Sequence, residues 1–546
     1  MKFSLTNFSL TLGDSLILSE VDFFVKTGSS VGVVGQSGSG KTMLAKSLMG
    51  LLPSPHKTSG VYEIDGKPFN LEAPESEWRK IRGKEIGLIM QDPFSSLDPM
   101  TRCGEQITAP FTTVERKNFD LEKSLREVGL PPETARKYPM ELSGGMRQRV
   151  VIASALAKEP KLLIADECTT SLDVIIQKEV LDLIEKIKKE RGMGVVIISH
   201  DLRLVAQRTE YMYVLNNGIV EENGPTSEVI NNPKQEYTKL LLEAKPFIIS
   251  GFTSKKEKHK NGKAKIPLLK TKSLYKKFDG FIALNDASIS VNEGECVAIV
   301  GESGSGKTTL ARCVIGLSTP TSGKVRFIHE GEIEKKEAAE GRERSEKGFY
   351  SFISNLFGKK NAAANNARLF DAQIVFQDPY SSLNPSLTIR EILSEALMAG
   401  GKNPDGKAPD EGRGKQITNL YKLMEFAEIP ENLLERKPAA LSGGQRQRIA
   451  IARALAPSPR LIICDEPIAA LDVIIQKQIL NTLKTFQKNH NISILFITHD
   501  LTAAYEIADR VYVMKHSRVV EEGECATIFH HPKHPYTKSL LEAALE

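Results

Sequence analysis

A glycine-rich loop that ends in a lysine and a threonine is the clearest chemical feature of the sequence. It reads Gly301-Glu-Ser-Gly-Ser-Gly-Lys307-Thr308, follows an apolar run at 296–300 and precedes a helix-prone segment. Glycines allow the backbone to curl so that successive N–H groups and a helix N-terminus face one anion. The lysine adds a positive charge and the threonine a hydroxyl suited to Mg²⁺. The pattern therefore predicts a site for a nucleoside triphosphate.

The same loop occurs earlier in the chain, and other motifs repeat with it in the same order. The earlier copy reads Gly35-Gln-Ser-Gly-Ser-Gly-Lys41-Thr42. The other repeated motifs are the glutamine segments that start at Gln91 and Gln377, the LSGG segments that start at Leu142 and Leu441, the acidic pairs Asp166-Glu167 and Asp465-Glu466, and the pairs His200-Asp201 and His499-Asp500. From the LSGG segments onward the two series keep one constant offset. The repeat indicates two copies of one domain, the second lengthened by insertions.

The composition agrees with two soluble globular domains. The 546 residues are 40% hydrophobic and 26% charged, and the net charge of +5 gives no global reason to expect nucleic acid as a partner. Six scattered cysteines without CxxC pairs disfavour a disulfide framework or zinc ribbon and fit a reducing cytosol. No apolar run approaches the roughly 20 residues of a membrane helix, and the first residues lack a signal-peptide core. We therefore expect action from outside the bilayer, if the protein works at a membrane.

Short apolar runs must position the acidic pairs and the histidines. The runs 162–165 and 461–464 have the continuous apolar character of buried parallel strands, and each is followed by an Asp-Glu pair. The aspartate can contribute to a Mg²⁺ shell, and the glutamate can orient or deprotonate water that attacks a γ-phosphate. His200 and His499 each follow another apolar run, the same number of residues after the glutamate. This equal spacing favours a role in the site over that of a buried core histidine.

The LSGG segments are expected to open helices. Ser143-Gly144-Gly145 precedes apolar residues at helical spacing, so it would place N–H groups and a hydroxyl at a helix N-terminus. Each half would then carry two anion sites, one at the loop and one at this segment. Taken alone, the segment also fits a helix that is merely N-capped.

The order of loop, glutamine segment, LSGG segment, acidic pair and histidine resembles the nucleotide-binding domain of ATP-binding-cassette (ABC) transporters. The resemblance covers nearly the whole chain and occurs twice. It implies an α/β fold with two P-loop ABC nucleotide-binding domains, each with a mixed-sheet core, an N-terminal antiparallel sheet and a helical subdomain. The glutamine segments and the tail His531-Pro-Lys-His-Pro-Tyr536-Thr-Lys-Ser-Leu-Leu are similar to the peptide-uptake branch, such as fused ATPases of microcin C/oligopeptide and glutathione importers.

The resemblance implies an ATPase that powers import of peptides or peptide-like solutes. ATP and Mg²⁺ would be its cofactors, and ATP would lie between the loop of one half and the LSGG segment of the other, an intramolecular pairing. Two separate transmembrane permease subunits would be its direct partners, and a periplasmic or extracellular solute-binding protein an indirect one. The chain would be peripheral, at the cytoplasmic face of the inner plasma membrane, and would not bind nucleic acid.

Site residues are carried over from the family motif by motif. Those expected to act in hydrolysis, the histidines by contact with the γ-phosphate, are Glu167, His200, Glu466 and His499. Those expected to hold Mg²⁺ are Thr42, Gln91, Asp166, Thr308, Gln377 and Asp465, of which the two glutamines would contact either Mg²⁺ or the attacking water. Those expected to bind nucleotide in the first half are Gly35, Ser37, Gly38, Ser39, Gly40, Lys41, Thr42, Ser143, Gly144 and Gly145. Those of the second half are Phe278, Gly301, Ser303, Gly304, Ser305, Gly306, Lys307, Thr308, Thr309, Ser442, Gly443 and Gly444.

We expect domain boundaries at 1–245 and 267–546, joined by a basic linker at 246–266. The linker can serve flexibility and solubility alone, or attract anionic lipid. The second half carries an insertion near 329–368, in which Phe349, Phe352, Ile353, Leu356 and Phe357 recur at helical spacing. An amphipathic helix there could contact membrane or permease, or pack on its own domain.

Two positions depart from the family pattern in ways that bear on function. Phe278 occupies the place of the aromatic residue that stacks on adenine in the family, whereas the first half has Leu12 there. We hypothesise weaker nucleotide binding at the first loop; equal binding, dominated by phosphates and Mg²⁺, is the alternative. Cys168 stands where the family usually has proline, and is either a site of oxidative inhibition or a small buried filler. The tail contains one cysteine, Cys525, so no iron–sulfur cluster is expected.

The competing class is a tandem ABC ATPase that acts on ribosomes or DNA rather than in transport. Ribosome-acting relatives carry a long charged helical arm between the halves, whereas this linker is short and rich in Gly and Lys. DNA-repair relatives carry zinc cysteines or coiled coils, and neither is present in the sequence. These differences favour transport.

Overall fold

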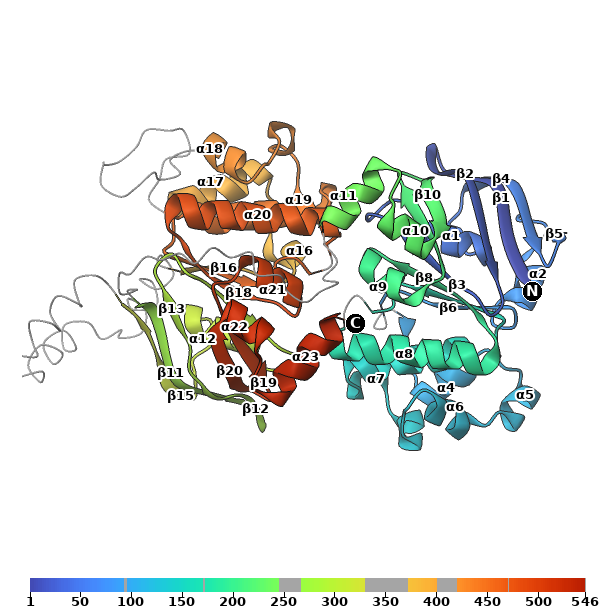
Figure 1. Cartoon of the computed structure of the whole chain (residues 1–546), viewed down its shortest axis with the longest axis horizontal. Helices are drawn as coiled ribbons and strands as arrows, with labels where there is room; N and C mark the ends of the chain where they lie inside the picture. The colour runs from blue at the N-terminus through green and yellow to red at the C-terminus, as the bar shows by residue number, and fades with distance from the viewer. Residues whose placement is uncertain are drawn as a thin grey trace, which may run out of the picture. The chain divides into compact units, whose positions relative to one another are not determined.

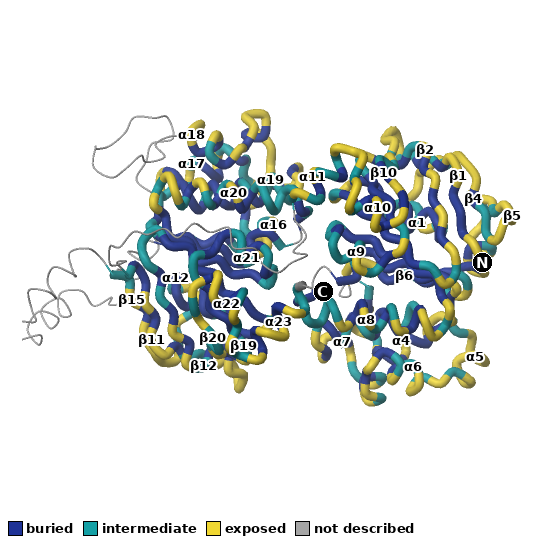
Figure 2. The backbone as a smooth tube through the Cα atoms, in the orientation of Figure 1, coloured by how far each residue is buried: buried dark blue, intermediate teal, exposed yellow. Residues whose placement is uncertain are grey.

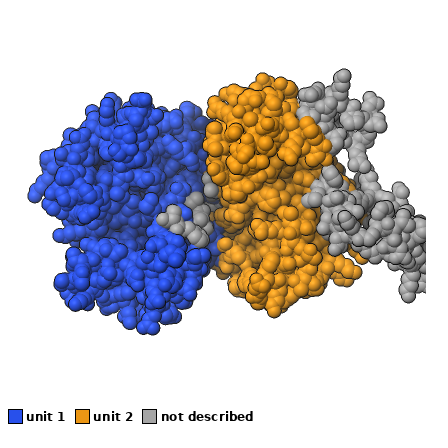
Figure 3. Space-filling view, turned by 180° about the vertical axis from the view of Figure 1, so that it is seen from behind, with its two compact units in different colours: residues 1–247, 472–474, 546 blue, residues 248–471, 475–545 orange. Residues whose placement is uncertain are grey.

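The computed structural model describes residues 1–92, 96–169, 172–244, 267–328, 372–399, 420–469 and 471–545. Two compact units are coloured separately in Figure 3, one made mostly of residues 1–247 and the other mostly of residues 248–471 and 475–545. The expected linker at 246–266 and the expected insertion at 329–368 lie outside the described residues. In the part of the chain that the structure describes, no helix combines the length and apolar character needed to cross a bilayer.

The first half contains two sheets (Figure 1). An antiparallel sheet has the strand order β2-β1-β4-β5, from β1 (Lys2–Leu12), β2 (Ser15–Lys26), β4 (His56–Ile64) and β5 (Lys67–Phe69). The core sheet has the order β10-β9-β3-β8-β7-β6, from β3 (Ser30–Val34), β6 (Ile86–Ile89), β7 (Leu162–Asp166), β8 (Gly194–Ser199), β9 (Tyr211–Asn216) and β10 (Ile219–Pro225). Only β10 runs antiparallel to its neighbour, so the core sheet is mixed, as expected.

The described helices of the first half lie between and after these strands. They are α1 (Lys41–Leu48), α2 (Glu75–Ile81), α4 (Cys103–Thr108), α5 (Thr113–Asn118), α6 (Leu121–Glu127), α7 (Gly144–Leu156), α8 (Val174–Arg191), α9 (Leu202–Arg208), α10 (Thr226–Asn231) and α11 (Glu236–Ala244). Short 3-10 helices lie at Pro132–Arg136 and Pro139–Glu141.

The second half repeats this architecture. Its antiparallel strands are β11 (Pro267–Phe278), β12 (Phe281–Ala287), β13 (Ser290–Asn292) and β15 (Ser322–Phe327). Its core sheet has the order β16-β17-β18-β14-β19-β20, from β14 (Cys296–Val300), β16 (Ala372–Val375), β17 (Leu461–Asp465), β18 (Ser493–Ile497), β19 (Arg510–Lys515) and β20 (Arg518–Glu524). Its helices are α12 (Lys307–Ile315), α16 (Pro379–Ser382), α17 (Ile389–Ala399), α18 (Leu420–Phe426), α19 (Gly443–Leu455), α20 (Val473–His490), α21 (Leu501–Ile507), α22 (Cys525–His530) and α23 (Pro535–Leu545), with 3-10 helices at Glu431–Leu433 and Pro438–Ala440.

The core sheet of each half is buried on both faces (Figure 2). In β7, Leu162 and Ile164 belong to the hydrophobic cluster under the antiparallel sheet, whereas Leu163 and Ala165 belong to the cluster on the opposite face. Because successive side chains of a strand point to opposite faces, a continuous apolar run is what a doubly covered strand requires. The expected fold class is confirmed.

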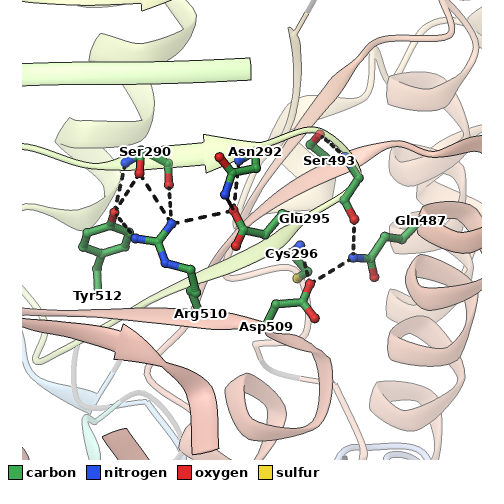
Figure 4. Close-up of polar contacts among 10 residues, drawn as sticks. Ser290, Asn292, Glu295, Cys296, Gln487, Ser493, Asp509, Arg510 and Tyr512 are labelled. Carbon is green, nitrogen blue, oxygen red and sulfur yellow. Dashed lines mark hydrogen bonds and ion pairs between the residues drawn. The ribbon is translucent and has the colours of Figure 1, made fainter. Parts of the chain in front are cut away.

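Polar contacts tie the antiparallel sheet to the core sheet. The Tyr213 hydroxyl accepts a hydrogen bond from the Phe24 N–H (3.1 Å), and in the second half the Tyr512 hydroxyl accepts one from the Ser290 N–H (3.0 Å). Figure 4 shows that Arg510 also donates to the Tyr512 hydroxyl (2.8 Å). This network lies at the amino ends of the core strands, away from the loops that carry the site motifs.

Candidate nucleotide-binding and hydrolysis site

Both glycine-rich loops connect a core strand to a helix, and their first glycine is sterically required. Gly35 has φ +155°, and a Cβ there would lie 2.1 Å from the Leu215 carbonyl oxygen on β9. Gly301 has φ +150°, and its Cβ would lie 2.2 Å from the Met514 carbonyl oxygen on β19. The loop therefore starts in close contact with the neighbouring strand, which only glycine permits.

The loop lysines fold back over the loop that precedes them. The Lys41 ammonium donates to the carbonyls of Gly35 (2.8 Å) and Gln36 (2.7 Å). Lys307 donates to Gly301 and Glu302, both at 2.7 Å. Burial lowers the pKa of Lys41, and the nearby carboxylates of Glu167 and Asp166 oppose this shift. Each lysine is thus buried at the N-terminus of the helix that follows its loop.

The inner surface of the first loop offers an unsatisfied hydroxyl. Ser39 is 3% exposed, and its Oγ has no hydrogen-bond partner among the described residues. A buried polar atom without a partner is costly, so a ligand oxygen at this position would satisfy it. In the second loop, the Ser305 hydroxyl lies 3.5 Å from the Lys307 ammonium. A phosphate group fits this combination of hydroxyl, ammonium and curled backbone.

A hydroxyl and a carboxylate meet where Mg²⁺ is expected. The Thr308 hydroxyl donates to Asp465 Oδ1 (3.0 Å), and the two residues stand at the start of α12 and the end of β17. Burial raises the pKa of Asp465, and that of Asp166 in the first half. One oxygen of Asp166, Oδ1, is buried without a partner among the residues that the structure describes. Hydroxyl and carboxylate oxygens are the hard ligands that suit a Mg²⁺ ion.

In the first half, three of the predicted site residues contact one glutamate, Glu167, which directly follows β7. The carboxylate of Glu167 accepts a hydrogen bond from the Gln91 amide (2.7 Å), lies 3.5 Å from His200 Nδ1 and 4.0 Å from the Lys41 ammonium. Its backbone has φ +46°, and its N–H donates to the Ile198 carbonyl (2.9 Å). Non-glycine residues in this region of φ are uncommon and cluster at functional sites.

The second half repeats the convergence on Glu466. Its carboxylate accepts a hydrogen bond from the Gln377 amide (3.0 Å) and lies 3.4 Å from His499 Nδ1, and its φ is +49°. Burial alone would raise the pKa of Glu466, but the contacts with His499 and Lys307 lower it. Burial alone would lower the pKa of His499, but the contact with Glu466 raises it. Both shifts favour an ion pair between these side chains when His499 is protonated.

The LSGG segments have the predicted helix N-termini. The Ser143 hydroxyl accepts a hydrogen bond from the Met146 N–H (3.3 Å) at the start of α7. The Ser442 hydroxyl accepts one from the Gln445 N–H (3.3 Å), and the Gln445 side chain accepts one from the Ser442 N–H (3.0 Å), which is a capping box at the start of α19. Within each half these contacts are local, so binding of nucleotide by the segments stays a prediction.

The position of the aromatic residue has a different environment in each half. Phe278 ends β11 with 47% of its surface exposed, and the Lys276 ammonium lies 4.7 Å from its ring centroid. Leu12 is partly buried at the end of β1 and packs on the hydrophobic cluster of the antiparallel sheet. An adenine contact at either position stays a prediction.

The environment of Cys168 decides between its two interpretations. The side chain is 4% exposed, and burial raises the pKa of its thiol to about 12. A thiol with such a pKa is almost entirely protonated at neutral pH and reacts slowly with oxidants. The structure therefore favours the small buried filler.

Sequence reasoning missed two residues that contact the loops. The Gln36 N–H donates to the Tyr237 hydroxyl (2.9 Å), and the Glu302 N–H donates to the Tyr536 hydroxyl (3.0 Å). Both tyrosines belong to the tails that repeat at the end of each half. Their shared place in that repeat was the available signal.

Comparison with known proteins agrees with the geometry. The family model described as ABC transporter matches residues 18–170 and 284–469, and the model described as the C-terminal region of oligopeptide/dipeptide transporters matches residues 221–266 and 520–546. A peptidoglycan transport ATP-binding protein, YejF, of Agrobacterium fabrum is 36% identical, covering 97% of this chain and 93% of its own. A glutathione import ATP-binding protein, GsiA, of Escherichia coli K12 is 34% identical, covering 96% of this chain and 85% of its own.

Among solved structures, the RNase-L inhibitor is similar with a TM-score of 0.61 at 21% identity, and covers 94% of this chain and 90% of its own. At that identity the likeness concerns the fold alone. The family models and the sequence relatives, in contrast, identify the family. The chain belongs to the ABC transporter family, in which it is a transport-coupled ATPase with two fused ABC domains.

Proposed function

We propose that the chain is the ATP-hydrolysing subunit of an importer for peptides or peptide-like solutes. The names of its relatives, which concern peptidoglycan and glutathione, and the oligopeptide-transporter tails at the end of both halves support this substrate class. They also favour transport over action on ribosomes or DNA. Two transmembrane permease subunits would transmit the work, and a solute-binding protein outside the membrane would deliver the solute to them. The chain would act at the cytoplasmic face of the membrane.

In this proposal each half binds one MgATP through its glycine-rich loop. Lys41 and Lys307 would contact the phosphates, and Thr42 with Asp166 and Thr308 with Asp465 would hold the metal. Bound Mg²⁺ would neutralise charge on the β- and γ-phosphates. The Ser-Gly-Gly segment of one half would close on the γ-phosphate held by the other. Ser143 and Ser442 support this because they stand at helix N-termini, where N–H groups attract anions.

Glu167 and Glu466 would orient the attacking water and accept its proton. Gln91 and Gln377 fix these carboxylates by hydrogen bonds, and the nearby histidines hold them from another side. The lowered pKa of Glu466 keeps it ionised, although it also makes the carboxylate a weaker base. Phosphoryl transfer depends mainly on positioning and electrostatic stabilisation, so an ordered carboxylate is suited to the task. This convergence of glutamine, glutamate and histidine, present in both halves, is the observation that carries the proposal.

Substituting Glu167→Gln, Glu466→Gln and both together tests the assignment. The double variant should bind MgATP but scarcely hydrolyse it, because glutamine keeps the size of the side chain and loses its basicity. Glu122→Gln is a matched control, since Glu122 is a solvent-exposed glutamate in the helical subdomain. Undiminished turnover in the singles and in the double variant would refute the roles of these glutamates.

A second experiment separates the two functional classes. ATPase activity is measured with the permease subunits reconstituted in liposomes, with ribosomes and with duplex DNA. Stimulation by the permease and solute alone supports import. Stimulation by ribosomes or DNA, without any by permease, would favour the non-transport class.

A further inference from the structure

The first peptide unit of each glycine-rich loop is held from both sides. In the first half, the Gly35 carbonyl accepts a hydrogen bond from the Lys41 ammonium (2.8 Å), and the N–H of the same peptide unit, that of Gln36, donates to the Tyr237 hydroxyl (2.9 Å). One end of the peptide dipole therefore contacts the lysine expected to bind phosphate. The other end contacts the C-terminal tail of the same half.

The second half has the same arrangement with a different side chain in the loop. The Gly301 carbonyl accepts from Lys307 (2.7 Å), and the Glu302 N–H donates to the Tyr536 hydroxyl (3.0 Å). Tyr536 is 5% exposed, so this hydrogen bond is shielded from water. Glutamine in one loop and glutamate in the other are equally compatible, because the tyrosine binds only the backbone.

A carboxylate fixes each tyrosine-bearing tail, and Glu222 is buried whereas Glu521 is partly buried. Glu222 on β10 accepts hydrogen bonds from the N–H groups of Lys234 (2.9 Å) and Gln235 (3.2 Å), directly before α11. Glu521 on β20 accepts the equivalent bonds from Lys533 (2.7 Å) and His534 (3.1 Å), directly before α23. Both oxygens of each carboxylate are used, so the direction of the tail helix is set by the edge hairpin of the core sheet.

We propose that Tyr237 and Tyr536 are positioning residues for the phosphate loops, through which the docked tail of each half tunes affinity for MgATP. The inference rests on the proposed function of the loops. The tyrosine prevents rotation of the peptide unit that also holds the lysine. With the hydroxyl removed, the N–H loses its partner, the peptide can turn, and the ammonium is no longer held at one position. The tail is then a part of the nucleotide site rather than a separate appendage.

The test compares Tyr237→Phe, Tyr536→Phe and the double variant with the unaltered chain. A fluorescent ATP analogue with excess Mg²⁺ is titrated, and KM for ATP and kcat are measured. Losing one buried hydrogen bond corresponds to about a tenfold loss of affinity. We expect weaker binding of the analogue and a raised KM in each single, a larger effect in the double variant, and little change in kcat at saturation. Tyr211→Phe and Tyr421→Phe, which remove hydroxyls on the surface of each half, are the controls.

A second pair of variants isolates the tail. Glu222→Gln and Glu521→Gln keep both tyrosines but weaken the hydrogen bonds that hold each tail. They should therefore raise KM for ATP too, but by less than the tyrosine substitutions do. Unchanged analogue affinity and KM in the double tyrosine variant, with or without a lower melting temperature, would overturn the inference. The unaltered chain serves a separate purpose: if it failed to hydrolyse ATP, the proposed function itself would fall.

Discussion

The Gln91 amide and the Glu167 carboxylate are joined by a 2.7 Å hydrogen bond, although 76 residues separate them in the chain. The bond exists because β6 and β7 are adjacent parallel strands, so the segments that follow them leave the sheet at the same edge. Gln377 and Glu466 repeat it at 3.0 Å after β16 and β17. The glutamine thus restrains the carboxylate that, in our proposal, orients the attacking water.

Replacing this glutamine should impair turnover more than binding. Gln91→Ala and Gln377→Ala together are expected to lower kcat by about 10- to 100-fold, because a misplaced carboxylate no longer aligns water. Affinity for the fluorescent ATP analogue should change much less. Gln207→Ala, at an exposed position on α9, is the control. An unchanged kcat in the double glutamine variant would contradict the positioning role.

Adding one methyl group at the start of a loop should destroy its shape. Gly301→Ala would place a Cβ 2.2 Å from the Met514 carbonyl at a φ of +150°. We expect loss of nucleotide binding at that loop and a stability cost of about 1–3 kcal/mol. Gly192→Ala, also at positive φ but with nothing within 4 Å, separates backbone strain from the clash. Equal effects of the two substitutions on nucleotide affinity would show that the clash is unimportant.

The carboxylate that clamps the first tail gives a pH dependence of stability. Burial alone would raise the pKa of Glu222, but the hydrogen bonds it accepts bring the pKa below its ordinary value of 4.5. A lowered folded-state pKa contributes stability above the unfolded-state value, and this contribution is lost as pH falls through the folded-state pKa. Glu222→Gln should therefore lower the melting temperature at pH 7 and make little difference at the lowest pH at which the chain stays folded.

The measurement is thermal unfolding of both proteins at pH 7, 5.5 and 4. Glu190→Gln, at an exposed glutamate on α8, should give no such pH-dependent difference. A melting-temperature difference between wild type and Glu222→Gln that grows as the pH falls would contradict the assignment.

The missing aromatic residue in the first half predicts unequal nucleotide sites. Stacking of a base on an aromatic ring is worth about 1–3 kcal/mol. Leu12→Phe should therefore tighten binding at the first loop, and Phe278→Ala should weaken it at the second. Titrations with the fluorescent ATP analogue measure these changes. Lys307→Ala disables the second loop when the first is titrated, and Lys41→Ala disables the first loop when the second is titrated. No gain from Leu12→Phe would end the hypothesis of unequal base stacking.

Much of the fold and site could be predicted because their signals are local or repeated. The run at 162–165 indicated a buried strand by its continuous apolar character, and the structure divides its side chains between two cores. The glycine-rich loops, acidic pairs and histidines were recognisable because each follows such a strand, and the LSGG segments because each opens a helix. Sequence pattern also predicted the helix start at Ser143.

Other features depend on tertiary contacts that leave no local pattern. Tyr237 reaches the loop across 201 residues of sequence, and only the folded sheet brings its tail beside Gln36. The positive φ of Glu167 and Glu466 follows from the hydrogen bond of each N–H to a neighbouring strand. The inertness of Cys168 depends on its burial, which composition could not decide.

Crosslinking tests whether each ATP is shared between opposite halves of the chain. All six native cysteines are buried, so engineered surface thiols can be addressed selectively. In the Glu167→Gln background, one variant carries Ser37→Cys with Ala440→Cys, from opposite halves, and the control carries Ser37→Cys with Glu141→Cys, from one half. All three positions are exposed. A short thiol crosslinker should join the first pair only when MgATP is present. Crosslinking that is independent of MgATP, or confined to the same-half pair, would show that ATP is not shared between the halves.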